Sequence, residues 1–437
     1  MAKSELTAGL LDLRGCIGRI NSGKYGLDVV FNTAVDAHGK VTLVFDPLPA
    51  SSDTRFLYDI FHHPGPTLEP FQLEATHPDG ARLSTRAAYI VSISSQPDHT
   101  DLEATCYDLE VEFPSSPDQV PIENKVEYLV PGLKAFRVIE VNTPIGLFAV
   151  CGAKDPADSG APYGVISIDT AIDATEEQEL IDDQVSRLLD VLSLANGQLL
   201  QWSMRKRFSG SRGVAVHFRT TSSISDQPFP LFPSLHLHPA IETALNNYTP
   251  ELRQDTGLDV AIAWSLMISR YSEADFLAAM TALEHLIGVY SDKNSLGGII
   301  EKGSFKSTIR PCVEEALRRA FASLGIPSGD DRETKMLGKL DDLNRSLKVC
   351  TEAFLTDHGV PVDDLKAGIP QLVRLRNDIV HRGQASPKNQ PHLERRLAVL
   401  QELLARVFLT LLRYHGPYCS YLHGYQIKQF PFDSTSP

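Results

Sequence analysis

Three side chains suited to phosphate chemistry lie together in the stretch RNDIVH, residues 376–381. Arg376 and Asn377 are adjacent, and His381 follows Asn377 one helical turn later. A planar guanidinium can hold two phosphate oxygens, an amide can donate a further hydrogen bond, and a histidine can exchange a proton near neutral pH. A helix would bring all three to one end, which indicates a candidate site for a phosphate group.

The helix that carries this stretch is expected to begin at Pro370, because proline is preorganised for the first helical position. Its apolar stripe is predicted to consist of Leu372, Val373, Ile379 and Val380. Arg376 lies near the middle of that stripe, where an unpaired charge would cost several kcal/mol. It should therefore meet a carboxylate or an anionic ligand, and Glu284, on the flank of a predicted helix at 272–290, is the expected partner.

Asn377 and His381 share one flank of the same helix, away from the stripe, and are expected to face a groove or a second subunit. A structural interpretation of the stretch stands beside this one. Asp378 and Arg382 form an ordinary pair one turn apart, Gly383 is a common helix terminator, and a histidine suits the last turn of any helix. The arginine on the apolar face favours the functional interpretation.

The chain of 437 residues, 42% of them apolar, is long enough for two or three domains. In its first half, apolar residues recur at every second position, as in Val41, Leu43 and Phe45, and turn residues separate the runs. This pattern predicts a β-rich region over residues 1–235, sandwich or barrel-like, with one helix at about 175–196.

After a proline-rich connector at 228–239 the apolar period becomes 3.6 residues and stays there. Residues 236–437 are therefore expected to form an all-α domain, which makes the whole chain an α+β multidomain protein. The predicted helices cover residues 257–270, 272–290, 309–324, 331–355, 370–382 and 391–414.

The net charge of −14 is distributed unevenly. Residues 1–239 hold 18 Lys and Arg against 31 Asp and Glu, or −13, whereas residues 240–437 hold 23 against 24, or −1. The acidity that argues against a polyanionic partner thus belongs to the first half. Within that half, a predicted hairpin carries a basic island that could contact nucleic acid or form a solvated face: Arg205, Lys206, Arg207, Arg212 and Arg219.

Other motifs carry weaker signals. The stretch 18–24 resembles the start of a P-loop, but Tyr25 replaces the Ser or Thr that would hold magnesium, and a hairpin turn is the better interpretation. The histidines at 236 and 238, and the set His415, Cys419 and His423, are poorly placed as metal ligands, so no metal and no cofactor is expected.

The expected location is the cytoplasm. Six scattered cysteines without a CxxC pattern suggest free thiols in a reducing compartment. No apolar run approaches the roughly 18 residues that cross a bilayer, and the N-terminus lacks the pattern of a signal peptide. We therefore expect no association with a membrane.

The stretch 376–381 also fits the R-x4-H signature of HEPN domains (higher eukaryotes and prokaryotes nucleotide-binding). Residues 240–415 resemble, in the order of their elements, the HEPN domain of ApeA-like anti-phage proteins: a helix containing Ala-Leu-Glu at 282–284, a long helical insertion, the R-x4-H helix with Gly383, and a long closing helix. The β-rich half resembles the N-terminal region of those proteins in position and general pattern.

This resemblance implies a metal-independent endoribonuclease with its site at a homodimer interface. By the match to the motif, Arg376 and His381 are catalytic and Asn377 is a further polar group of the site, while Glu284 supports the arginine. The implied substrate is RNA, with tRNA among the candidates, and the implied role is an abortive-infection toxin that a phage-derived trigger activates through the N-terminal region. The alternative is a module without catalytic activity that binds a nucleotide or serves only for dimerisation.

Overall fold

The computed structural model describes residues 10–431, apart from 24, 37, 50–53, 63–68, 115–121, 136, 153–162, 171–177, 211–212, 222–228, 268, 270, 297 and 340–344. The chain divides into two compact units, 1–246 and 247–437. The first is β-rich and the second is mostly helical, which agrees with the predicted α+β composition.

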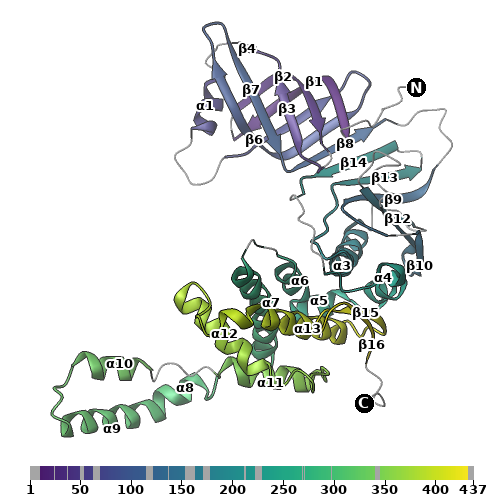
Figure 1. Cartoon of the computed structure of the whole chain (residues 1–437). Helices are drawn as coiled ribbons and strands as arrows, with labels where there is room; N and C mark the ends of the chain where they lie inside the picture. The colour runs from purple at the N-terminus through teal and green to yellow at the C-terminus, as the bar shows by residue number, and fades with distance from the viewer. Residues whose placement is uncertain are drawn as a thin grey trace. The chain divides into compact units, whose positions relative to one another are not determined.

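A six-stranded antiparallel barrel forms the first part of unit 1 (Figure 1). Its strands, in order around the ring, are β6 (Arg82–Ser95), β5 (Phe71–Thr76), β1 (Leu11–Ser22), β2 (Tyr25–Val35), β3 (Val41–Phe45) and β7 (His99–Cys106). The pairing of β7 with β6 closes the ring, so these strands leave few free edges. Alternate side chains such as Phe31, Leu43 and Leu73 point inward and are buried, which confirms the barrel-like prediction.

Seven more strands continue the same antiparallel sheet beyond β6. They are β8 (Asp108–Phe113), β14 (Gly213–Arg219), β13 (Met204–Gly210), β9 (Ile122–Pro131), β12 (Tyr163–Asp169), β11 (Gly146–Cys151) and β10 (Ile139–Thr143). The predicted helix at about 175–196 is α3 (Gln178–Asn196), and its Asp182 accepts a hydrogen bond of 2.6 Å from Tyr128 of β9. Short elements complete the unit: β4 (Leu48–Pro49), α1 (Arg55–Phe61) and η2 (Ser234–His236).

The helix α4 (Leu237–Asn246) packs on α3 and belongs to unit 1 by its contacts. Helical periodicity begins near residue 235, as the sequence indicates, whereas the two units meet between Asn246 and Asn247. The apolar face of α4, with Ile241 and Ala244 buried, covers part of unit 1.

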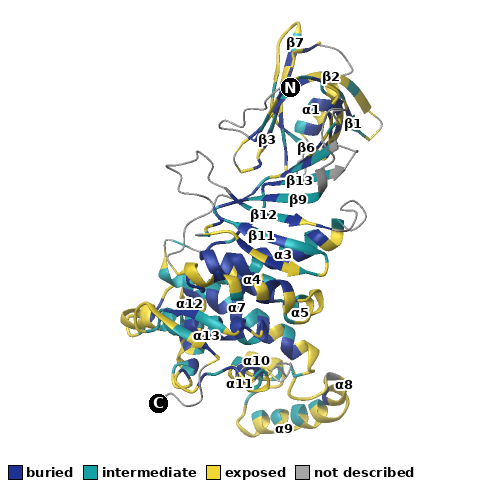
Figure 2. Cartoon of the chain, turned by 90° about the vertical axis from the view of Figure 1, so that its right-hand side faces the viewer, coloured by how far each residue is buried: buried dark blue, intermediate teal, exposed yellow. Residues whose placement is uncertain are grey.

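Unit 2 is built around α7 (Ser272–Lys293), which packs against five other helices. These are α5 (Pro250–Thr256), α6 (Leu258–Ser265), α11 (Leu347–Asp357), α12 (Ile369–Arg382) and α13 (Leu393–Leu411). Between α12 and α13 lies a short turn, η4 (Gln390–His392). After α13 the chain forms an antiparallel hairpin, β15 (Gly416–Ser420) and β16 (Gln426–Phe430), so the prediction that residues 236–437 are all-α is wrong for this segment, whose strands pair with each other. Figure 2 shows the buried residues of α7 and α13 in dark blue.

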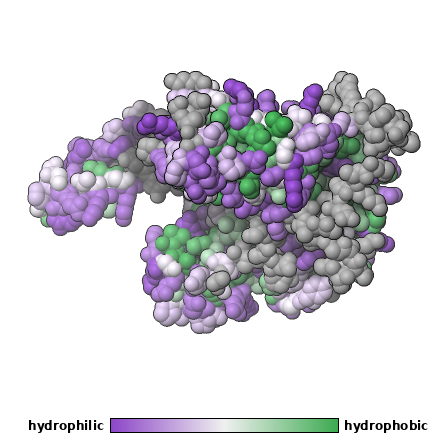
Figure 3. All heavy atoms as spheres, turned by 90° about the horizontal axis from the view of Figure 1, so that it is seen from above, coloured by the Kyte–Doolittle hydropathy of each residue, from purple (hydrophilic) through white to green (hydrophobic). Residues whose placement is uncertain are grey.

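The helices α8 (Lys302–Ser304), α9 (Arg310–Ser323) and α10 (Asp331–Lys339) form an arm, which follows α7 and precedes α11 in the sequence. The π-helical turn η3 (Phe305–Ile309) joins α8 to α9. No residue of α9 is fully buried, and Figure 3 shows mostly hydrophilic side chains over the part of the picture that holds α9 and α10.

The prediction of a single helix over residues 331–355 is wrong, because α10 ends at Lys339 and α11 begins only at Leu347.

A buried polar network joins α13 to the hairpin and to the loop before α12. The side chains of Arg406 and Glu402, one turn apart on α13, are 2% and 1% exposed. Arg406 donates to Asp364 and to the carbonyl of Pro361, and Glu402 accepts hydrogen bonds of 2.9 Å from Tyr418 and 2.7 Å from Ser420. Because both charges are paired and hydrogen-bonded, their burial is tolerated. Removal of one partner leaves the charge of the other buried and unpaired.

The substitution Arg406→Leu is expected to lower the free energy of unfolding by about 3–5 kcal/mol, because it leaves Glu402 buried without its cation. The control Arg319→Leu removes an arginine whose side chain is 73% exposed, and it should change stability by less than about 0.5 kcal/mol. Denaturant unfolding of the full chain measures both. Equal effects of the two substitutions would show that the network does not hold unit 2 together.

Candidate functional site

An ion pair between α12 and α7 fixes the arginine of the candidate site. Arg376 donates from Nε to Oε1 of Glu284 at 2.8 Å and from Nη2 to Oε2 at 3.0 Å. The two side chains are 32% and 28% exposed, so the pair is partly shielded and still open to solvent on one side. Paired parallel hydrogen bonds of this kind set the orientation of the guanidinium plane as well as its position. The predicted contact between these two residues is present.

The apolar stripe of α12 differs from the predicted one. The residues buried on α12 are Ile369, Leu372, Leu375 and Ile379. Val380, which was predicted to belong to the apolar stripe, is 51% exposed. Spacings of three, three and four keep the buried residues on one face, and this face is centred further from Arg376 than the predicted one. The arginine therefore lies at the edge of the packed surface, where Glu284 can reach it.

Asn377 and His381 are exposed, as predicted for this flank of the helix. Nη1 of Arg376 donates to Oδ1 of Asn377 at 3.3 Å, which connects the carboxylate, the guanidinium and the amide in one row. His381 lies one turn further along α12. Within the described part of the chain, no hydrogen bond joins His381 to that row.

Asp378 fastens the end of α12 to the loop that follows, a role that the sequence did not reveal. Its Oδ2 accepts hydrogen bonds of 2.8 Å from the backbone amide of Ser386 and from Nδ2 of Asn389, and its Oδ1 lies 3.0 Å from Nε of Arg382. Hydrogen bonds from Ser386 and Asn389, together with the charge of Arg382, lower the pKa of Asp378 to about 2. The sequence predicted only the pair with Arg382.

A signal for this role was available in the sequence. A carboxylate near the C-terminal end of a helix faces the negative end of the helix dipole, so a partner nearby is needed to offset the repulsion. The helix itself ends as predicted, with Gly383 in the left-handed region at φ 75° and its amide donating to the carbonyl of Ile379 at 2.7 Å.

The other candidates from the sequence do not converge with this cluster. Residues 18–22 of the P-loop-like stretch form the end of β1, where Ser22 pairs with Tyr25 of β2, and Lys24 lies outside the described residues. His236 lies in η2 and His238 in α4. Cys419 is buried in β15, and His415 and His423 are exposed. All six cysteines are free. Among the residues that the structure describes, no three His, Cys, Asp or Glu side chains are grouped so as to hold a metal ion.

Two arginines of the basic island of unit 1 are engaged within their own unit. Arg205 forms an ion pair with Asp182 of α3, and its guanidinium lies 5.8 Å from the ring centre of Trp202. The guanidinium of Arg219 lies 5.7 Å from the same ring. Arg212 is outside the described residues. These contacts support the structural interpretation of the island.

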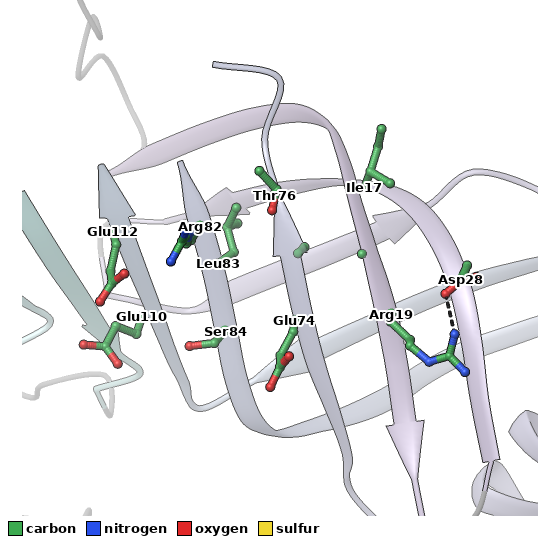
Figure 4. Close-up of a pocket in the computed structure, with 12 residues that line it drawn as sticks. Ile17, Arg19, Asp28, Glu74, Thr76, Arg82, Leu83, Ser84, Glu110 and Glu112 are labelled. Carbon is green, nitrogen blue, oxygen red and sulfur yellow. Dashed lines mark hydrogen bonds and ion pairs between the residues drawn. The ribbon is translucent and has the colours of Figure 1, made fainter. Parts of the chain in front are cut away.

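A shallow depression on the outer face of the barrel is lined by residues of β1, β2, β5, β6 and β8 (Figure 4). Arg19 forms an ion pair of 2.9 Å with Asp28 at one side of it, and the carboxylates of Glu74, Glu110 and Glu112 stand along the strands at the other. It is an acidic surface with none of the residues predicted for the site.

Comparison with known proteins adds no relative: no protein-family model, no curated protein and no solved structure matches this chain. In the described ranges, no helix is long and apolar enough to cross a lipid bilayer.

The role of Asp378 predicts a specific pH dependence. A carboxyl whose pKa is lower in the folded than in the unfolded chain, where it is about 3.9, stabilises the fold above that value and loses the effect as the pH falls toward 2. The substitution Asp378→Asn should therefore lower the free energy of unfolding at pH 5, and the difference from the parent should shrink between about pH 4 and pH 2. Unfolding curves across that range measure it. A difference in the free energy of unfolding that stays constant with pH would exclude a stabilising effect of the ionised Asp378 carboxylate.

Proposed function

We propose that unit 2 is a metal-independent endoribonuclease of the HEPN type in which Arg376 and His381 act on one phosphodiester. The observation that carries the proposal is the bidentate pair of Arg376 with Glu284, five residues before an exposed histidine on the same helix. A guanidinium has five N–H donors. Two of them meet Glu284 and one meets Asn377, so two remain for the oxygens of a phosphate group.

The reaction that suits these groups is transfer of the phosphoryl group to the neighbouring 2′-hydroxyl of RNA. The 2′-oxygen loses its proton to a base and forms a bond to phosphorus, while the bond to the 5′-oxygen breaks and that oxygen receives a proton from an acid. The products are a 2′,3′-cyclic phosphate and a 5′-hydroxyl. Arg376 would stabilise the negative charge that builds up on the phosphorane oxygens, and Asn377 would help to orient them.

Acid and base are both needed, and each chain places one histidine in the cluster. Two copies of His381 related by a two-fold axis would supply both groups. The exposure of Asn377, Val380 and His381 on the outer flank of α12 is compatible with such a homodimer, because this flank is not used in packing within unit 2.

The resemblance of residues 240–415 to the HEPN domain of ApeA-like anti-phage proteins supports the same proposal. The two helices that the resemblance singles out are α7, with Glu284, and α12, with the R-x4-H motif, and these two are joined by the ion pair. By the same resemblance, the barrel unit would respond to a phage-derived trigger and would restrain a nuclease whose targets, tRNA among them, lie in the cytoplasm.

A second candidate has one observation in its favour. The charge of Arg376 is balanced by Glu284, as it would be in an ion pair whose role is to join two helices. A module without catalytic activity would then bind a nucleotide or form only a dimer. A nucleotide that co-purifies with the protein, with no growth arrest on overexpression, would favour this candidate.

The nuclease proposal predicts that His381→Ala and Arg376→Ala each lower the rate of RNA cleavage by at least about a hundredfold, the lower range of what a general acid–base group contributes. The fold should be kept, because His381 is exposed and Arg376 lies at the edge of the core. The control His415→Ala removes another exposed histidine of unit 2 and should leave cleavage unchanged.

Cleavage of a labelled RNA oligonucleotide, with circular dichroism to verify folding, measures these effects. The same oligonucleotide made of DNA should remain intact, because it lacks the attacking 2′-hydroxyl. Cleavage that persists in both variants, or efficient cleavage of DNA, would exclude the mechanism.

A further inference from the structure

The corner between α12 and α13 is the part of unit 2 where positive charge accumulates. Residues 374–396 contain six Lys and Arg against two Asp and Glu, a local charge of +4 in a chain whose net charge is −14. Figure 1 shows α12 and α13, which pack against each other, and the corner joins the end of one to the start of the other.

Hydrogen bonds hold the corner together as one surface beside His381. Asp378 of α12 accepts from the amide of Ser386 and from Asn389 in the connecting loop. Oδ1 of Asn389 in turn accepts a hydrogen bond of 2.8 Å from Nη1 of Arg396 on the first turns of α13. These contacts keep the loop and the start of α13 close to the last turns of α12, which carry the histidine.

Most of this positive charge is not balanced by neighbouring carboxylates. The ion pairs of the corner are those of Arg376 with Glu284 and of Arg382 with Asp378. Three further side chains are exposed and take part in no ion pair within the described part of the chain: Arg374, Lys388 and Arg395. Their charges face the solvent.

The arm of the same unit shows the opposite arrangement, although it is just as exposed. Arg310 and Arg318 both pair with Glu314, and Arg319 pairs with Glu315. On α10, Lys335 pairs with Asp331. On α9 each arginine thus pairs with a glutamate one turn away, whereas Arg374, Lys388 and Arg395 of the corner pair with no carboxylate in the described part of the chain.

We propose that the basic corner, defined as Arg374, Lys388 and Arg395, binds the phosphates of an RNA strand on either side of the bond that is cut. The inference rests on the proposed function, since it places the substrate across the site. Lys and Arg without carboxylate partners attract phosphates and release bound counterions, so the corner supplies affinity that is independent of base sequence. The exposed His381 then meets a phosphodiester that the neighbouring charges hold in place.

Binding to the full chain carrying His381→Ala tests the corner without cleavage. A fluorescent single-stranded RNA is titrated with this protein and with the same protein carrying Arg374→Gln, Lys388→Gln and Arg395→Gln. The triple substitution should raise the Kd by about tenfold or more and lower the slope of log Kd against log salt by about 2, since each phosphate contact to a single strand contributes about 0.7.

The matched control is the triple substitution Lys306→Gln, Lys335→Gln and Lys339→Gln, which removes the same charge from exposed positions of the arm. It should change the Kd by less than about twofold, as expected for charges that make no phosphate contact. Replacement of Arg374 and Arg395 by lysine keeps the charge and should restore most of the affinity, which separates a charge effect from a folding defect.

Equal losses in the two triple variants, or no loss in either, would overturn the inference. So would a phosphopeptide that binds the corner more tightly than RNA does. The proposed function is tested separately. If the parent protein cuts no RNA, the nuclease proposal fails, and the binding titration still tests whether the corner binds RNA. If the parent does cut RNA, an unchanged KM for long RNA in the corner variant excludes the binding role of the corner and leaves the nuclease proposal intact.

Discussion

The ion pair between Arg376 and Glu284 is the interaction on which the candidate site depends. It crosses from α12 to α7, the helix around which unit 2 is packed, so the position of the guanidinium is set by the core and not by the surface. The carboxylate also keeps the arginine at the edge of the core and leaves two of its N–H groups unused. An arginine fixed in this way is preorganised for an anion, because little side-chain freedom remains to be lost on binding.

The end of α12 is held by a second set of contacts. Asp378 points away from the packed face and fastens the following loop through Ser386 and Asn389, and the loop reaches α13 through Arg396. Asn377, which precedes this aspartate, and His381, which follows three residues later, stay exposed. The ion pair with Glu284 thus fixes the arginine, loop contacts fix the helix end, and Asn377 and His381 remain accessible.

Much of this could be predicted from the sequence, and the exceptions have physical causes. The pair with Glu284 followed from the cost of burying a charge, and the α+β composition followed from the change in apolar period. The helical periodicity predicted that Val380 is buried, because it lies seven residues after Val373 and so on the same face of a helix. In the structure Leu375 is buried and Val380 is exposed, because the neighbouring helices pack against a different face. The closure of the barrel depends on the pairing of β6 with β7 and of β1 with β5, which the choice between a sandwich and a barrel left open. The loop contacts of Asp378 join α12 to Ser386 and Asn389, which follow the helix in a segment where no periodic pattern exists.

The most direct test of the central claim is to map the 3′ ends of cellular RNA after expression of the parent chain and of His381→Ala. If His381 takes part in cleavage by the 2′-hydroxyl, the parent chain produces new ends that carry a 2′,3′-cyclic phosphate and the variant does not. The positions of these ends also identify the target RNA. New ends that appear equally in both, or that carry a 3′-hydroxyl, would contradict the assignment of His381 and the attack by the 2′-hydroxyl.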